Sequence, residues 1–99
     1  MGAEKIFAAE KQGRKIAVEV KSFLAASPVH DLEEALGQYI VYEDILEVSE
    51  PERNIYLAVR EEVYLDIFSE PIGQLLLQKK RLKLIVFDSS KEIIVRWID

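Results

Sequence analysis

Hydrophobic and polar residues alternate near the start of the chain in the pattern of a β-hairpin. We expect strands over 4–11 and 14–22 around a tight turn at Gly13, because glycine readily adopts the positive φ that such turns favour. Successive side chains of a strand point to opposite faces, so Glu19 and Lys21 share one face of the second strand. The other face is apolar and carries Ile16, Val18 and Val20.

The rest of the chain alternates between helical and strand patterns. Ser27-Pro28 suits the start of a long helix, because serine is a good N-cap and proline fits the first helical position, and we expect this helix to reach about Val48. The elements expected after it are a buried strand over 54–59, a short helix over 61–69, a helix from Pro71 to Lys79 or Lys80, and strands over 82–88 and 92–98. This order predicts an α/β (α+β) fold with one mixed sheet, and residues 1–99 as a single domain.

Composition narrows the class of protein. An apolar content of 49% in 99 residues supports a modest core, and the absence of cysteine fits a reducing cytoplasm. No apolar run approaches the roughly 20 residues of a membrane helix, so we expect a cytoplasmic protein. The net charge of −5 argues against coating of nucleic acid by bulk electrostatics, because phosphate neutralisation depends on Lys and Arg.

The pair Glu19 and Lys21 has two interpretations. An acid-x-Lys motif on one strand face resembles the centre of restriction-endonuclease-like nuclease sites, in which the carboxylate holds a divalent metal and the lysine steadies the attacking water or the phosphate. The same spacing also arises by chance on any solvated strand face. If the site is real, Glu19→Ala should abolish metal binding and leave folding nearly intact, because a solvated strand face tolerates change.

The long helix adds a second pair of candidate residues. Gln38 and Tyr42 lie one turn apart on the stripe formed by Asp31, Ala35, Gln38, Tyr42 and Ile45. In the nucleases that the strand motif resembles, a Gln-x-x-x-Tyr pair approaches the metal site and the DNA backbone. The simpler interpretation is that both residues border the apolar face made by Leu32, Leu36, Tyr39, Ile40 and Leu46.

Several uncommon segments, in the same order, make the resemblance more specific. They are Gly2–Lys5, Ala8–Lys11, Lys15–Phe23, Asp31–Tyr39, Glu50–Arg53, Tyr56–Val59, Pro71–Gln74, Leu82–Asp88 and Ile94–Ile98. Over essentially its whole length the chain resembles the XisH family, the fdxN-element excision controlling factors of cyanobacteria. The resemblance implies a restriction-endonuclease-like PD-(D/E)xK fold. It also implies a role in excising a DNA element that interrupts a nitrogen-fixation operon, alongside a XisI protein and a separate recombinase.

One feature of the family is missing from this sequence. Members of the XisH family, which this chain resembles, carry an extra helix and strand before the segment matching Gly2–Lys5. An aspartate just before that segment would be the first metal-binding acid. We therefore expect a shortened relative or a start placed too far downstream. Metal sites of this kind use two acids, so a bound Mg²⁺ (or Mn²⁺ as its substitute) needs Glu19 and a replacement acid. Glu4, expected opposite Lys21, is a better candidate than Glu10, which is expected at the turn.

Two functions from different classes remain open. The first is a metal-dependent or degenerate nuclease-fold module in DNA-element excision, with Glu19, Lys21, Gln38 and Tyr42 as its site. The second is a noncatalytic assembly module that binds protein. Short apolar hairpins leave sheet edges and apolar surface for association to cover. We therefore expect a homodimer or a complex with a XisI-like protein, with DNA as a further partner.

Overall fold

Five strands form one mixed sheet in the order β1-β2-β3-β4-β5. The computed structural model describes the backbone of residues 4–99 and the side chains of residues 8–99. The strands are β1 (Glu4–Lys11), β2 (Arg14–Lys21), β3 (Asn54–Arg60), β4 (Leu84–Asp88) and β5 (Ile93–Ile98). The two hairpins at the edges are antiparallel, whereas β2, β3 and β4 run parallel. The predicted fold class is confirmed.

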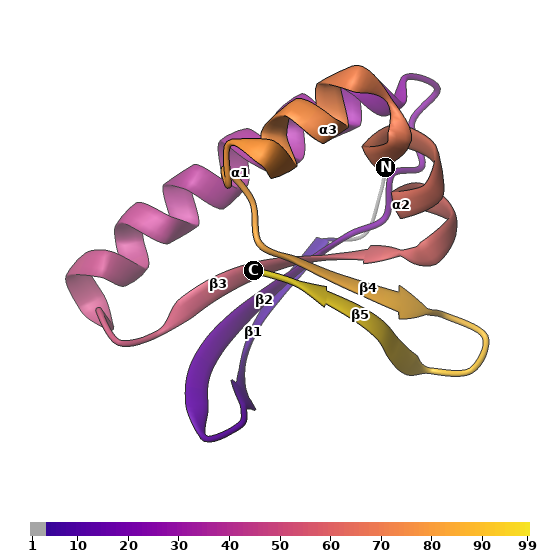
Figure 1. Cartoon of the computed structure of the whole chain (residues 1–99). Helices are drawn as coiled ribbons and strands as arrows, with labels where there is room; N and C mark the ends of the chain where they lie inside the picture. Colours follow the sequence, from indigo (N-terminus) through magenta and orange to yellow (C-terminus); the bar gives the residue numbers. More distant parts are fainter. Residues whose placement is uncertain (1–3) are drawn as a thin grey trace.

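The helices occupy the two connections between the parallel strands. They are α1 (Pro28–Ser49), α2 (Glu61–Asp66), the 3-10 helix η1 (Ile67–Ser69) and α3 (Pro71–Gln78). Crossovers between parallel strands are right-handed, and two of them in succession along one direction of the sheet place all helices on the same face. Figure 1 shows this arrangement, with the other face of the sheet left without a helix. The predicted elements are confirmed with ends shifted by at most two residues. Strand β4 begins at Leu84 instead of Leu82, and the helix predicted over 61–69 is divided into α2 and η1.

Hydrogen bonds explain where α1 begins and how it is held against the sheet. The Ser27 hydroxyl accepts a hydrogen bond from the backbone N–H of His30 at 3.2 Å, as an N-cap does. Farther along, the buried Tyr39 hydroxyl donates to the carbonyl of Ile55 at 3.3 Å and accepts from the N–H of Lys83 at 3.2 Å. Burial raises the pKa of Tyr39 to about 12. One phenol thus ties α1 to β3 and to the segment that leads into β4.

Apolar side chains pack on both faces of the sheet. The larger cluster lies under the helices and includes Leu57, Val59 and Leu84 from the central strands, with Leu32 and Phe68 from the helical layer. A smaller cluster lies on the face without helices and consists of Ile16, Val18, Tyr56, Ala58 and Ile85. Among the residues that the structure describes, no helix is both long enough and apolar enough to cross a bilayer.

Candidate functional site

Glu19 and Lys21 lie on the face of β2 that α1 covers. Both side chains are buried, with exposed fractions of 1% for Glu19 and 3% for Lys21. The interpretation of this strand face as solvated is therefore wrong. Alternation along β2 was assigned correctly, but the parallel crossover turns the charged face towards the helical layer, and Val18 packs on the opposite face.

Lys21 forms an ion pair with an acid on α1 that the sequence analysis did not select. Its Nζ lies 2.6 Å from Oε1 of Glu34. The hydrogen bond and the positive charge of Lys21 lower the pKa of Glu34 below its ordinary value. Glu34 precedes Gln38 by one helical turn, and this spacing was the available signal. The structure thus brings Lys21 of β2 together with Glu34 of α1, and Glu19 is buried on the same strand face as Lys21.

The predicted helix pair lies on the same helix, farther along. Gln38 is one turn beyond Glu34 and half-buried, and its Oε1 is buried without a hydrogen-bond partner among the described residues. Tyr42 is one further turn away and packs against the edge of the larger core cluster. Gln38 therefore presents an acceptor inside the protein, while Tyr42 has a packing role that explains its position.

Asp31, at the start of α1, is buried for a structural reason. Its Oδ2 accepts a hydrogen bond from the backbone N–H of Ala25 at 3.0 Å, and its exposed fraction is 4%. A buried carboxylate needs such a partner, because desolvation without a hydrogen bond is costly. Asp31 fixes the segment that joins β2 to α1, and so helps place the helix over Glu19 and Lys21.

The strand register places the two candidate replacement acids. Glu4 pairs with Lys21 and Glu10 pairs with Lys15 near the turn, as the hairpin pattern predicted. The side chain of Glu4 lies outside the described part of the structure. Within the described part, no three His, Cys, Asp or Glu side chains come together as ligands for a metal ion. The described residues alone do not fit a Mg²⁺ site, because such a site takes several oxygen ligands.

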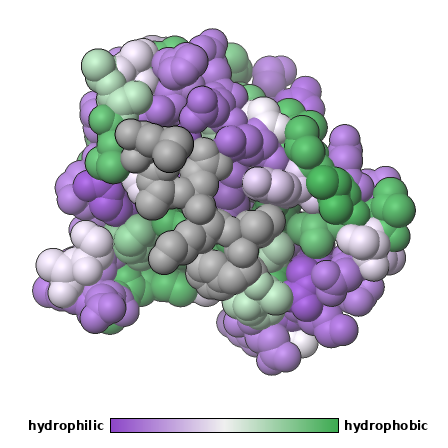
Figure 2. All heavy atoms as spheres, turned by 180° about the vertical axis from the view of Figure 1, so that it is seen from behind, coloured by the Kyte–Doolittle hydropathy of each residue, from purple (hydrophilic) through white to green (hydrophobic). Residues whose placement is uncertain are grey.

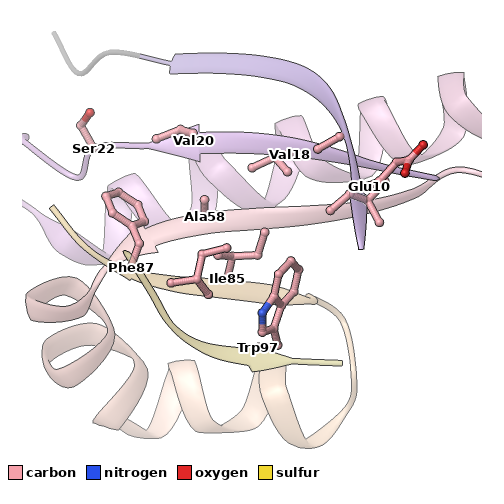
Figure 3. A pocket seen from close by; sticks show the side chains of 11 residues that line it. Glu10, Val18, Val20, Ser22, Ala58, Ile85, Phe87 and Trp97 are labelled. Carbon is pink, nitrogen blue, oxygen red and sulfur yellow. The ribbon is translucent and has the colours of Figure 1, made fainter. Parts of the chain in front are cut away.

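An apolar hollow lies on the face of the sheet without helices. It has a volume of about 580 Å³. Side chains from all five strands line it, and Figure 3 shows Val18, Val20, Ile85, Phe87 and Trp97 among them. Polar groups at its border come from Glu10 and Ser22. Its size and apolar lining are typical of binding pockets. The sequence analysis placed Val18 and Val20 on the apolar face of one strand without anticipating that this face forms a hollow.

Two proteins of known structure resemble this chain in both fold and sequence. The chain is similar to the crystal structure of an XisH family protein from Nostoc punctiforme, with 39% identity and a TM-score of 0.88. It is also similar to that of a fdxN element excision controlling factor protein from Anabaena variabilis, with 41% identity and a TM-score of 0.87. Both likenesses cover 95% of this chain and 74% of the crystallised one.

No curated protein matches the chain. The model of the XisH protein family matches residues 1–95. This match spans nearly the whole sequence and agrees with the two crystal structures. The chain therefore belongs to the XisH family.

Proposed function

We propose that this chain is a controlling factor for the excision of a DNA element, of the fdxN-element type. The observation that carries the proposal is its likeness to the Anabaena variabilis protein described as such a factor, at 41% identity over 95% of this chain. The likeness covers 74% of that protein's chain, so the two proteins share most of one fold. The proposal concerns regulation of excision and assigns no strand exchange to this chain.

We further propose that the chain works as a restriction-endonuclease-like module whose site is built around Glu19 and Lys21. Support comes from their burial beneath α1 beside Glu34, since a lysine held in a water-poor setting exerts a strong field on a phosphate. Gln38 contributes a buried acceptor on the same helix. Lys21 positions a phosphate or a water in this scheme, and Glu34, which is 46% exposed, swings aside to admit it.

A divalent metal belongs to this proposal only if a further acid joins Glu19. Glu4 is the candidate, because its register position is opposite Lys21 and directly paired residues share a face. Mg²⁺ or Mn²⁺ bound there would stabilise negative charge on a phosphate. With the described residues alone the module is a degenerate one, which binds without cutting.

Calorimetric titration with Mn²⁺ tests the site. The wild-type chain is compared with Glu19→Gln and Glu4→Gln, which keep side-chain size, and with Glu92→Gln, an exposed acid near β5, as the control. Saturable binding that both site variants lose and the control keeps supports a metal-dependent module, and a DNA cleavage assay follows. Absence of binding with a folded far-UV circular dichroism spectrum supports the degenerate module.

The second candidate function is noncatalytic assembly, and the apolar hollow on the open face favours it. Such a surface is suited to a second chain, as a homodimer or in a complex with a XisI-like protein. Trp97 is the sole tryptophan of the chain and lines the hollow. A tryptophan-free XisI-like partner should therefore shift the fluorescence of Trp97 on binding. Complex formation without such a shift would place the partner elsewhere.

A further inference from the structure

The segment from α3 into β4 differs from the rest of the chain in the sign of its charges. Residues 71–87 contain Lys79, Lys80, Arg81 and Lys83 and no acid, in a protein whose net charge is −5. Figure 2 shows hydrophilic side chains over much of the surface seen from behind, so polarity alone does not distinguish this segment. Its distinguishing property is the segregation of positive charge, which creates a local positive field on an acidic protein.

Three of these cations form an exposed row, which we name the basic cap. Lys79, Lys80 and Arg81 directly follow α3, and all three are exposed. Within the described residues none of the three forms an ion pair. Lys83 is not part of the basic cap, because it is half-buried and lines a small hollow together with Glu43 and other residues. The basic cap thus presents three adjacent positive charges to solvent.

The backbone of the basic cap is fixed by the hydrogen bonds that end α3. The N–H of Lys80 donates to the carbonyl of Leu77 at 3.0 Å, and the N–H of Arg81 donates to the carbonyl of Leu76 at 2.9 Å. This is the Schellman pattern, in which the left-handed residue is usually glycine. Here that residue is Lys80, with a φ of 54°. A lysine in this conformation costs energy that a glycine would avoid, and such strain is concentrated at functional sites.

The end of a helix explains only part of this charge. Cations near a helix C-terminus interact favourably with the helix dipole, but the effect is confined to the last turn and is screened by salt. It does not explain why the strained position carries a lysine, or why a further cation lies on either side. A ligand with a row of negative charges would use all three cations.

We propose that the basic cap contacts the phosphate backbone of duplex DNA. Protein–DNA interfaces are much more positively charged than protein–protein interfaces, and lysine is depleted at the latter. A net charge of −5 argues against coating of DNA, whereas three local cations are enough for a weak contact that positions the protein without reading the base sequence. The inference rests on the proposed role in DNA-element excision for its choice of ligand, and it does not require the Glu19 site.

Fluorescence anisotropy with a labelled duplex of about 20 base pairs tests the contact. Log K should fall by about 2.7 for each tenfold increase in salt, because each neutralised phosphate contributes about 0.9. Two duplexes of unrelated sequence should bind alike, since phosphates carry no sequence information. The triple variant Lys79→Gln, Lys80→Gln, Arg81→Gln should flatten the salt dependence and raise Kd about tenfold or more at low salt.

Lys80→Gly separates the charge from the fold. Glycine suits the left-handed position, so this variant should keep or raise the Tm. It should nevertheless reduce the salt slope by about one unit and raise Kd several-fold, because one phosphate contact is lost. Lys91→Gln removes an exposed lysine from the turn between β4 and β5 and is the control, which should leave Kd within about twofold. Wild-type binding by Lys80→Gly would overturn the proposal.

Other outcomes would overturn it as well. They are absence of binding by the folded wild-type chain, and equal losses in Lys91→Gln and Lys80→Gly. A polyglutamate peptide that competes as well as a duplex of equal charge would make the ligand an acidic protein instead of DNA. Excision of the element in cells distinguishes this failure from failure of the proposed function. Excision that needs the chain but tolerates the triple variant refutes the basic cap alone, whereas excision that is unchanged without the chain refutes the proposed function.

Discussion

Lys21 is a buried cation, and its environment determines what the strand motif can do. Its side chain is 4% exposed, whereas that of its partner Glu34 is 46% exposed. Burying a charge is unfavourable unless hydrogen bonds and an opposite charge compensate for lost water. Glu34 of α1 thus provides the opposite charge for Lys21. Glu19 lies on the same strand face and is buried as well. The motif is part of the interior, so its replacement affects folding as well as any site chemistry.

Lys21→Met should lower the free energy of unfolding by about 1–3 kcal/mol, because it removes a charge-assisted hydrogen bond from a buried cation to Glu34. Lys15→Met on the same strand is the control. Lys15 is 54% exposed and lies 3.6 Å from Glu52, and exposed pairs contribute under about 1 kcal/mol. Urea unfolding followed by circular dichroism measures both variants. Equal losses in the two would show that Lys21 is solvated.

The glycines of α1 and α3 differ in how closely other atoms approach them. In α1, a Cβ on Gly37 would meet nothing within 4 Å. In α3, a Cβ on Gly73 would lie 2.3 Å from the carbonyl oxygen of Ile67 and 2.6 Å from the Cα of Phe68. The close approach of α3 to η1 therefore requires glycine at residue 73, whereas Gly37 only weakens α1. The sequence shows both as isolated glycines in helical patterns.

Gly37→Ala should raise the free energy of unfolding by about 0.5–1 kcal/mol, because alanine is the better helix former and has room. Gly73→Ala should lower it by about 1–3 kcal/mol or more, because backbone atoms must move apart. Thermal unfolding of the two variants beside the wild type measures the effects. A stabilised Gly73→Ala would mean that α3 stands farther from η1 than described.

At the scale of the whole molecule, the two edge strands meet over the open face of the sheet. Lys11 of β1 lies 3.0 Å from Asp99, which follows β5, and Tyr56 of the central strand β3 donates a short hydrogen bond to the same carboxylate. The Lys11 Nζ also lies 4.5 Å from the ring centroid of Trp97. We name this group the edge clasp. It closes one end of the open face, which is why residues of the central strands are buried there without a helix.

Acid should release the edge clasp. The hydrogen bonds from Tyr56 and then Lys11 lower the pKa of Asp99 below its ordinary value. A lowered folded-state pKa contributes stability above the unfolded value near 3.9, and this contribution is lost as pH falls through the folded-state pKa. Asp99→Asn should therefore lower the free energy of unfolding at pH 7, by under about 1 kcal/mol because the side chain is exposed.

Urea midpoints at pH 7 and at about pH 2 check this expectation. The difference between Asp99→Asn and the wild type should be present at pH 7 and vanish at the lower pH. Asp66→Asn, which changes an exposed acid of α2, is the control and should differ little from the wild type at pH 7. A difference for Asp99→Asn that persists unchanged in acid would show that the carboxylate does not hold the clasp.

The candidate site was only partly predictable. Period-two alternation placed Glu19 and Lys21 on one strand face, and helical spacing placed Gln38 and Tyr42 on one side of α1. Neither pattern states which face of a sheet the following helix covers, so the burial of Glu19 and the pairing of Lys21 with Glu34 were missed. Glu34 was one acid among six on its helix, and only its distance from Lys21 distinguishes it.

The sequence by itself determined the elements, their order and the family, because caps, turns and apolar periodicity act between near neighbours in the chain. Only the tertiary structure decided which side of each strand is covered, how the apolar hollow forms, and that the edge clasp joins residues at opposite ends of the sequence. These features depend on the right-handed crossovers and on the curl of the sheet. Local patterns do not contain them, because they arise from contacts between residues far apart in the chain.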